Sequence, residues 1–368
     1  MRFPGFEGEW ARCTLGEIGE PYIGLTYSPA DVVNEGGTIV FRSSNIQNGE
    51  IDYSDIVRVN KKIKDSIITR KDDLLICARN GSPRLIGKNA LLKDADAGQT
   101  FGAFMLVFRS NDNHFVHQLL STKGYYSQVS ENLGARINQI TTSNIKDFEF
   151  YFPKSLAERN KIADFLNLID ERISIQNKVI EKYESLIKAL RRHIFSTIES
   201  EKEVTIADVL SYEQPTKYIV SDTEYSDNKD LTPVLTANKA FVLGYTEETK
   251  GIYDKGPCII LDDFTLDSKI VDFPFKVKSS AIKILSAKTS VHLRYIYEYL
   301  KFLDLNTEEH KRHYISEIEP MTIELPDEDA IQSIAYLFDR MDQRRQRLER
   351  DLQLLKYQKD YLLRALFI

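Results

Sequence analysis

The sequence predicts an α+β protein in which two mixed, mostly β bodies are separated by two long helices that form an antiparallel coiled coil. Residues 162–195 show helical apolar periodicity and contain neither Pro nor Gly. The same pattern returns at residues 334–367, which align with the first stretch without a gap. Each helix follows an alternating run that ends at a proline. The chain is therefore expected to be an internal tandem repeat.

The two helices are expected to meet along an apolar seam whose residues recur three, four or seven positions apart. The predicted seam residues are Ile162, Phe165, Ile169, Ile173, Ile180 and Tyr183 in the first helix and Leu337, Met341, Leu348, Leu352, Leu355 and Leu362 in the second. Gln176 also occupies a seam position, where a polar residue costs stability but fixes the register. The seam requires one particular partner, and the repeat supplies it within the same chain.

The repeat extends through the strand that precedes each helix. Asp170 aligns with Asp342 at a shift of 172 residues, and Pro153 aligns with Pro326 across a one-residue gap. Proline cannot continue a strand ladder and suits the position just before a helix. The unit of strand, proline and long helix therefore occurs twice.

The two bodies repeat one order of elements. In the first, residues 14–18 form a short helical turn, strands are expected at 38–41, 51–59, 73–77 and 104–108, and a helix at about 114–132. In the second, a similar turn is expected at 205–209, strands at 258–261 and 278–285, and a helix at about 291–303. The predicted domains are residues 1–153, 154–200, 201–326 and 327–368.

Composition excludes several classes of protein. The chain has 368 residues, which is too long for one ordinary domain. Of these residues 42% are hydrophobic, which is enough for several cores. No apolar run approaches the length of a membrane span, and the N-terminus lacks a signal-peptide pattern, so a cytoplasmic location is expected. Cys13, Cys77 and Cys258 are isolated, which indicates buried small hydrophobes rather than disulfides or a zinc site.

The charge distribution does not by itself point to nucleic acid. The formal net charge is −6. Residues 1–153 carry 17 Lys and Arg against 18 Asp and Glu, whereas residues 201–326 carry 15 against 22. If DNA is the ligand, the basic residues must be concentrated on one face.

Several weak motifs in a fixed order resemble the specificity subunit of type I restriction-modification systems. They are the opening Arg-Phe-Pro-Gly-Phe at residues 2–6 with Trp10 and residues 15–18, the strand-proline-helix joints, residues 72–76 and 86–90, and the helix endings at 189–195 and 361–368. The resemblance covers essentially the whole chain. The second half departs from the pattern because it lacks a counterpart of the opening.

The resemblance implies that residues 1–153 and 201–326 are target-recognition domains, each reading one half of a bipartite, asymmetric site in double-stranded DNA. The conserved spacer helices would be residues 154–200 and 327–368, and their length would set the spacer between the half-sites. The subunit would do no chemistry and would bring two methyltransferase subunits, and two restriction subunits, to the site. S-adenosylmethionine would belong to the methyltransferase, and ATP and Mg to the nuclease.

The residues agree with a chain that has no catalytic or metal site of its own. No Asn-Pro-Pro-aromatic or Asp-Pro-Pro-aromatic tetrapeptide of an amino-methyltransferase is present. Residues 81–89 have the wrong glycine spacing for a phosphate loop. His114 and His117 are spaced as metal ligands on a helix could be, but no Cys or carboxylate pattern completes a site.

Polar and basic loop residues are the candidates for reading bases, because Arg and Lys suit guanine and Asn and Gln suit adenine. In the first body the candidates are Arg42, Ser44, Asn45, Arg79, Asn80, Ser82, Arg84, Lys88, Arg136, Asn138, Gln139 and Thr141. In the second they are Thr236, Asn238, Lys239, Lys276, Lys278, Ser279, Ser280, Lys311 and Arg312. The loop at residues 79–84 ranks first because two arginines flank a Gly-Ser-Pro turn. For any single residue, a solvated turn is an equally good interpretation.

Two alternatives stay open. The acidic second body also suits a coiled-coil scaffold whose bodies bind other proteins. The arginine-rich stretch at residues 340–350 is interleaved with acidic residues, which favours a solvated, salt-bridged helix face over a docking face for a methyltransferase.

Overall fold

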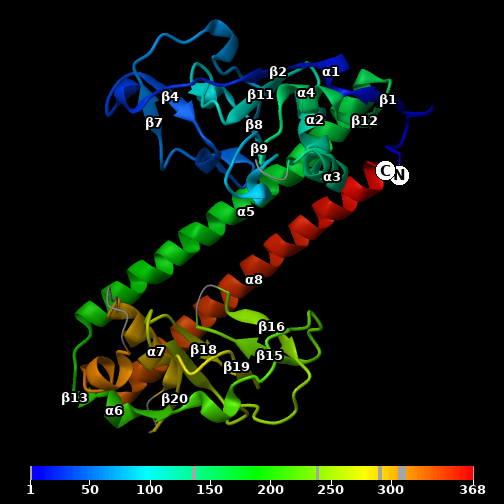
Figure 1. Cartoon of the computed structure of the whole chain (residues 1–368). Coiled ribbons are helices and arrows are strands. Elements are labelled where there is room, and N and C mark those ends of the chain that lie inside the picture. Colours follow the sequence, from blue (N-terminus) through cyan, green and yellow to red (C-terminus); the bar gives the residue numbers. More distant parts are fainter. Residues whose placement is uncertain (1, 135–137, 238–239, 289–291, 306–311, 368) are drawn as a thin grey trace. The chain divides into compact units, whose positions relative to one another are not determined.

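The protein folds as two compact units, each of which combines a β-rich body with parts of both long helices. The computed structural model describes residues 2–134, 138–237, 240–288, 292–305 and 312–367. One unit contains Met1–Lys178 and Arg350–Ile368, and the other contains Val179–Glu349. The helices α5 (Leu156–Thr197) and α8 (Glu328–Leu366) each contribute a segment to both units (Figure 1).

The body of the first unit is built from two four-stranded sheets. Its strands are β1 (Ala11–Thr14), β2 (Glu20–Ile23), β3 (Val32–Val33), β4 (Thr38–Phe41), β5 (Ile46–Gln47), β6 (Glu50–Ile51), β7 (Val57–Val59), β8 (Leu74–Cys77), β9 (Asn89–Leu91), β10 (Thr100–Phe101), β11 (Met105–Arg109) and β12 (Glu149–Phe152). Its shorter helices are α1 (Leu15–Ile18), α2 (Asn113–Leu119), α3 (Lys123–Glu131) and α4 (Thr142–Asp147). The sheets have the orders β2-β11-β8-β9 and β10-β4-β7-β3, and β1 pairs with β12.

Strand β8 is buried on both faces, which explains its unbroken apolar sequence. Successive side chains of a strand point to opposite faces. Leu74 and Ile76 belong to the core that the helices cover, whereas Leu75 and Cys77 belong to the core toward the second sheet. The central sheet therefore separates two hydrophobic cores and holds the ends of its strands in place.

The second unit repeats this architecture. Its strands are β13 (Lys202–Thr205), β14 (Leu210–Glu213), β15 (Thr232–Leu235), β16 (Val242–Thr246), β17 (Cys258–Asp262), β18 (Ser268–Val271), β19 (Lys276–Val277), β20 (Ile282–Ala287) and β21 (Thr322–Leu325), and its shorter helices are α6 (Ile206–Val209) and α7 (Leu293–Phe302). The sheets have the orders β14-β20-β17-β18 and β16-β15-β19, and β13 pairs with β21. Strand β17 again divides two cores, with Ile259 and Leu261 on one side and Cys258 and Ile260 on the other. This confirms the predicted repeat of mixed, mostly β bodies.

The strand-proline-helix joints form as predicted. Strand β12 ends at Phe152 and β21 ends at Leu325, each directly before its proline. The proline removes one donor at the edge of a two-stranded ladder, where this loss is tolerated.

The long helices pack antiparallel within each unit. In the first, Lys359 Nζ lies 2.5 Å from Asp170 Oδ1, and Leu363 shares a core with Leu166. In the second, the rings of Phe195 and Phe338 stack at 6.4 Å. Residue numbers thus rise along α5 in the direction in which they fall along α8.

Most predicted seam residues are buried or half-buried, but one repeat-related pair is not. Phe165 and Leu337 are 37% and 38% exposed, while the next residues, Leu166 and Phe338, are at most 1% exposed. At this one position the buried residue comes one place later than predicted, because Leu166 and Phe338 pack into the cores of the β-rich bodies. Gln176 is half-buried in the groove that Ile175 and Leu354 also line.

Two predicted elements of the first body are broken by local hydrogen bonds. The helix expected at 114–132 stops at Leu119 and restarts as α3, because the Thr122 hydroxyl accepts a hydrogen bond from Tyr125 N and caps the new helix. The strand expected at 51–59 is split into β6 and β7. Between them the Asp52 carboxylate accepts a hydrogen bond from Ser54 N, which closes a turn instead.

The described residues include no helix that is long and apolar enough to cross a membrane. Cys77 and Cys258 are buried in the cores, and Cys13 is half-buried. Burial raises the pKa of the Cys77 thiol to about 11. These thiols therefore behave as small apolar groups.

Candidate nucleic-acid interface

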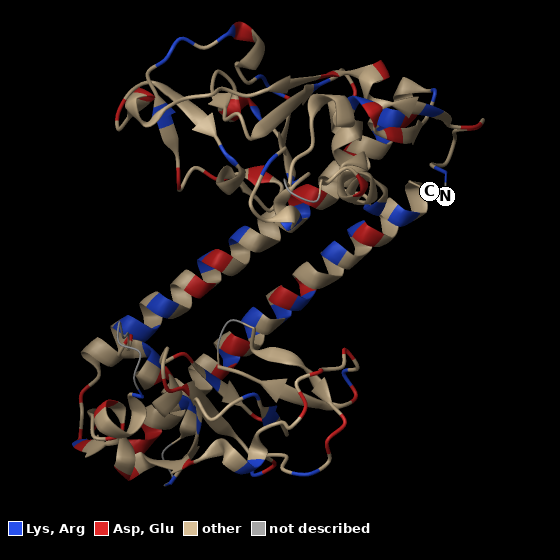
Figure 2. Cartoon of the chain, in the orientation of Figure 1, with Lys and Arg blue, Asp and Glu red and all other residues tan. Residues whose placement is uncertain are grey.

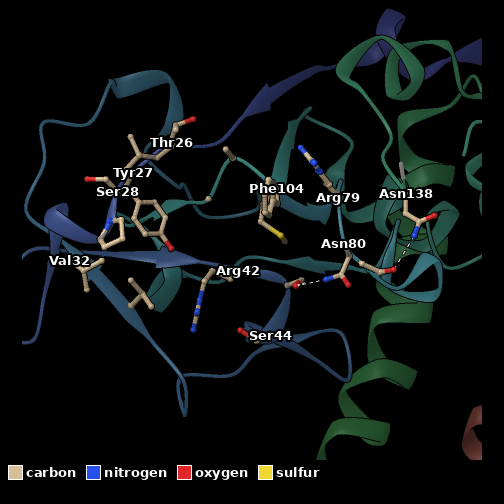
Figure 3. A pocket seen from close by; sticks show the side chains of 18 residues that line it. Thr26, Tyr27, Ser28, Val32, Arg42, Ser44, Arg79, Asn80, Phe104 and Asn138 are labelled. Atoms are coloured by element: carbon tan, nitrogen blue, oxygen red, sulfur yellow. Dashed lines mark hydrogen bonds between the residues drawn. The ribbon is translucent and has the colours of Figure 1, made fainter. Parts of the chain in front are cut away.

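The first unit contains an open hollow of about 1070 Å³ at the ends of its central strands (Figure 3). Four segments supply most of its lining, namely the loop after β2, the turn after β4, the loop after β8 and the link between β10 and β11, and Val57 of β7 and Asn138 complete it. Its lining residues are Leu25, Thr26, Tyr27, Ser28, Pro29, Val32, Arg42, Ser43, Ser44, Val57, Arg79, Asn80, Gly81, Gly102, Ala103, Phe104, Met105 and Asn138. The fold therefore brings together five of the predicted reading residues: Arg42, Ser44, Arg79, Asn80 and Asn138.

The charge of the hollow differs from that of the chain. Among the described residues that line it are two arginines and not one carboxylate, although the chain contains 55 Asp and Glu against 49 Lys and Arg. The remaining polar lining consists of hydroxyl and amide groups. An interface of this composition attracts polyanions and offers donors and acceptors for base edges.

The turn after β4 is held by internal hydrogen bonds. Asn45 is 1% exposed, and its amide donates to the carbonyls of Asp52 and Asp55 at 3.0 and 2.9 Å. Arg42 Nη2 lies 2.7 Å from Asp55 Oδ2. Asn45 therefore supports the turn rather than facing a ligand, and Ser44 stays exposed at its tip.

The loop after β8 is fixed to its neighbours through Asn80. Its amide donates to Ser43 Oγ at 3.0 Å, and its carbonyl oxygen accepts from Ser82 N at 3.0 Å. Asn138 donates to Gly81 O at 3.0 Å. These bonds join three segments that lie far apart in the sequence, so the hollow is preorganised.

Arg79 makes no ion pair within the part of the chain that the structure describes, and it is the exposed arginine of this loop that lines the hollow. It is exposed, and its Cζ lies 5.0 Å from the centre of the Phe104 ring. A guanidinium stacked on a ring keeps its edge donors available. Arg79 thus has the geometry of a base-reading side chain.

The other candidates of the first unit lie outside the hollow. Ser82 is half-buried, and Arg84 is exposed on the following turn. Lys88 lines a separate cavity, and burial lowers its pKa. Gln139 forms a bridge with Arg79, and the Thr141 hydroxyl caps α4 by accepting from Asn144 N at 3.1 Å. Arg136 lies outside the described residues.

In the second unit the candidates are divided between the core and the surface. Lys276 is 2% exposed, and its ammonium lies 2.9 Å from Glu248 Oε2. This buried ion pair leaves Lys276 no exposed charge with which to contact DNA. Lys278, Ser279 and Arg312 are exposed, and Arg312 Nη2 donates to Ser280 Oγ at 3.4 Å. Thr236 is half-buried, whereas Asn238, Lys239 and Lys311 lie outside the described residues.

Sequence reasoning missed the aromatic part of the hollow. Phe104 was expected inside a strand, but it precedes β11 and is 56% exposed. Tyr27 also lines the hollow, in a loop to which no function was given. A sequence signal existed in the Gly102-Ala103 pair, which breaks the apolar run just before Phe104.

The described residues hold no group of three or more His, Cys, Asp or Glu side chains arranged to bind a metal ion. His114 and His117 are instead hydrogen-bonded to Asp72 and Asn89 at 3.1 Å each.

Comparison with known proteins shows similarity to one family over part of the chain. Residues 7–185 match the family model described as type I restriction modification DNA specificity domain. The chain is 41% identical over 169 residues to the type I restriction enzyme EcoR124I/EcoR124II specificity subunit of Escherichia coli, an alignment that covers 42% of this chain and 42% of the relative. It is 26% identical over 200 residues to the StySPI specificity subunit of Salmonella potsdam, covering 52% of this chain and 42% of the relative.

A solved structure is similar over nearly its whole length. The crystal structure of the type I restriction-modification system S subunit from M. genitalium matches with a TM-score of 0.65 and 17% identity, covering 100% of this chain and 99% of that one. This likeness concerns the fold. The match to the curated relatives spans about two fifths of their length. Residues 7–185 of this chain thus match the type I restriction modification DNA specificity domain, and the whole chain has the fold of the solved S subunit.

Proposed function

We propose that this chain is the non-catalytic DNA-specificity subunit of a type I restriction-modification complex. Its two bodies read the halves of a bipartite, asymmetric site in double-stranded DNA. The observation that carries the proposal is the hollow of the first unit, where arginine, hydroxyl and amide groups converge without a lining carboxylate among the described residues. Neutralised phosphates and bidentate arginine contacts to guanine are the main sources of such binding.

The same proposal assigns the partners. Two methyltransferase subunits bind S-adenosylmethionine and modify the DNA, and two restriction subunits use ATP and Mg. This chain supplies no cofactor site, works in the cytoplasm and scaffolds the assembly. The alternating charges along α5 and α8 support a solvated surface there, as in the ion pairs of Arg345 with Asp342 and Glu349 (Figure 2).

The test is genome-wide detection of methylated adenine in a methylation-free host that expresses this chain with its methyltransferase. The expected result is one split, asymmetric motif that disappears when this chain is omitted. The Arg79→Ala variant should weaken or relax one half of the motif by about 10- to 100-fold in binding, because one bidentate base contact is lost. The Arg84→Ala variant is the matched control, since Arg84 is exposed in the same loop but does not line the hollow.

A protein-binding scaffold predicts a different outcome. Binding of a split-site duplex by this chain with its methyltransferase should weaken steeply as salt rises if phosphates are neutralised. Stable co-purification of the two proteins without new methylation and without salt-dependent DNA binding would contradict the proposal.

A further inference from the structure

Phe104 is an exposed aromatic residue where its neighbours in the chain are buried. Its side chain is 56% exposed, whereas Met105, Leu106, Val107 and Phe108 are at most 2% exposed. Those four residues pair with β8 in the sheet, whereas Phe104 lies before the first paired residue and its ring is not needed for the pairing. An exposed large apolar group inside a hollow is typical of a ligand contact.

The backbone holds Phe104 and Arg79 next to each other. The carbonyl of Phe104 accepts hydrogen bonds from Ala78 N at 2.9 Å and Arg79 N at 3.0 Å. The two side chains project from this junction into the same hollow (Figure 3). With the Arg79 guanidinium 5.0 Å from the ring centre, the pair presents an apolar surface beside a set of edge donors.

The rest of the apolar lining faces the same space. Val32 is 41% exposed, and Tyr27, Val57 and Ala103 also line the hollow. In the major groove of DNA the apolar group that projects from a base edge is the 5-methyl group of thymine. Arg79 makes no ion pair among the described residues, and this cation together with the lack of a lining carboxylate there favours DNA over an apolar protein segment as the occupant.

We infer that Phe104 is a specificity-determining residue that contacts the methyl group of a thymine, while Arg79, positioned against its ring, reads the neighbouring base. This inference rests on the proposed function and names one chemical feature of the first half-site. The pair would favour a step that combines a thymine with a guanine.

The test uses the full chain with its methyltransferase and duplexes carrying the motif found by methylation mapping. Each thymine of the half-site read by the first body is replaced in turn by deoxyuridine, which removes only the methyl group. Competition binding should weaken about three- to fivefold at one position, as expected for one buried methyl group. The Phe104→Ala variant should bind thymine and uracil duplexes equally at that position.

Two variants provide controls. Phe104→Leu keeps an apolar side chain and should retain the sensitivity to uracil. Ile23→Ala removes a 54% exposed apolar residue of the same body that does not line the hollow, and should behave as the unchanged protein does.

The outcomes separate this inference from the proposed function. Suppose that the unmodified duplex binds in a salt-dependent way. The inference alone would then be overturned if no position were sensitive to uracil, or if the sensitivity persisted in Phe104→Ala. A half-site that lacks thymine would overturn it as well. Failure to bind any split duplex would overturn both.

Discussion

The two β-rich bodies share a strand order but use the end of their central strand in opposite ways. Arg79 follows β8, and its backbone N–H donates to Phe104 O at 3.0 Å. Asp263 follows β17, and its backbone N–H donates to Ala281 O at 2.8 Å, as Ala78 N donates to Phe104 O at 2.9 Å, so Asp263 is structurally equivalent to Ala78, the residue before Arg79. Ala78 and Asp263 are 4% and 1% exposed, whereas Arg79 is exposed beside the hollow.

The buried carboxylate of the second body holds its own chain together. Asp263 Oδ1 accepts from the backbone N–H groups of His313 and Tyr314 at 3.1 and 2.8 Å. Its other oxygen lies 3.1 Å from Lys283 Nζ, which also donates to Tyr212 OH at 3.1 Å. The end of the central strand therefore carries a small buried residue and an exposed arginine in one body and a buried, internally paired carboxylate in the other, so the equivalence of folds does not transfer a function between them.

The same contrast appears where each body packs on the long helices. In the first unit, Gln118 donates to Asn167 Oδ1 at 2.8 Å and to Asp170 Oδ2 at 2.9 Å. In the second, Glu298 occupies the corresponding place on α7, and its carboxylate lies 2.7 Å from Arg191 Nη2 and 3.1 Å from Arg294 Nε. One joint is held by amide hydrogen bonds and the other by buried ion pairs.

Breaking the buried ion pair of the second body should have the largest effect. Lys283→Met should lower the free energy of unfolding of that unit by about 3–5 kcal/mol, because Asp263 is left buried without a counter-charge. Hydrogen exchange of the β17 amides measures it. Arg79→Met, at the end of the corresponding strand of the first body, should change stability by less than about 0.5 kcal/mol. A small effect of Lys283→Met would show that the pair is not the main support.

Exchanging Gln118 and Glu298 tests the difference between amide hydrogen bonds and ion pairs where each body packs on the long helices. Gln118→Glu should lower the free energy of unfolding of the first unit by about 2 kcal/mol, since it brings a second carboxylate against Asp170 in a buried site. Trp10 is the one tryptophan of the chain, and its ring lies 6.0 Å from that of Phe367 in the first unit, so its fluorescence reports this unfolding.

Glu298→Gln is the reciprocal exchange and should lower the free energy of unfolding of the second unit by a similar ~2 kcal/mol, because Arg191 loses its carboxylate. Arg294 would keep Asp339 at 3.6 Å. If either exchange stabilised its unit, the assignment of the two joints would be wrong.

The first unit should also lose stability in mild acid through His117. Burial lowers the pKa of His117 from 6.5 to about 4, with the charges of Lys359 and His114 acting in the same direction and that of Asp170 opposing them. The unfolded chain therefore binds a proton in a range where the folded unit does not. Stability is complete above pH 6.5 and falls toward pH 4.

The expected loss between pH 7 and pH 5 is about 1–2 kcal/mol, measured by Trp10 fluorescence during denaturation. His117→Gln should remove most of this dependence, because Gln preserves a hydrogen-bonding group beside Asn89 and does not titrate. Tyr297 stands at the corresponding place on α7, so the same pH step should affect the second unit less. An unchanged pH profile in His117→Gln would assign the effect to other groups.

The smallest expected difference in stability is between variants of Phe165 and Leu337, the two partly exposed residues of the long helices. Leu337→Gln should change the stability of the second unit by less than about 0.5 kcal/mol, as for other exposed positions. Phe165→Gln should cost about 0.5–1.5 kcal/mol more, because the ring of Phe165 meets that of Phe3 edge-on at 5.8 Å. The N-terminal segment that supplies Phe3 has no counterpart in the second half. Denaturation of both variants checks the difference, and equal costs would contradict it.

The sequence by itself determined the repeat, the two long helices, the joints at Pro153 and Pro326 and the α+β class. These features depend on periodicity and on the backbone chemistry of proline, which are local properties of the chain. It also indicated Arg42, Arg79, Asn80 and Asn138 as polar loop residues that could read a ligand.

Only the tertiary structure decided which of these residues act together. Asn45 and Lys276 resembled the other candidates in the sequence, but packing buries both and pairs them internally. Phe104 resembled a core residue, yet the register of β11 leaves its ring outside the core beside Arg79. Burial and partnership arise from contacts between segments distant in the sequence, so no local pattern could distinguish a reading residue from a supporting one.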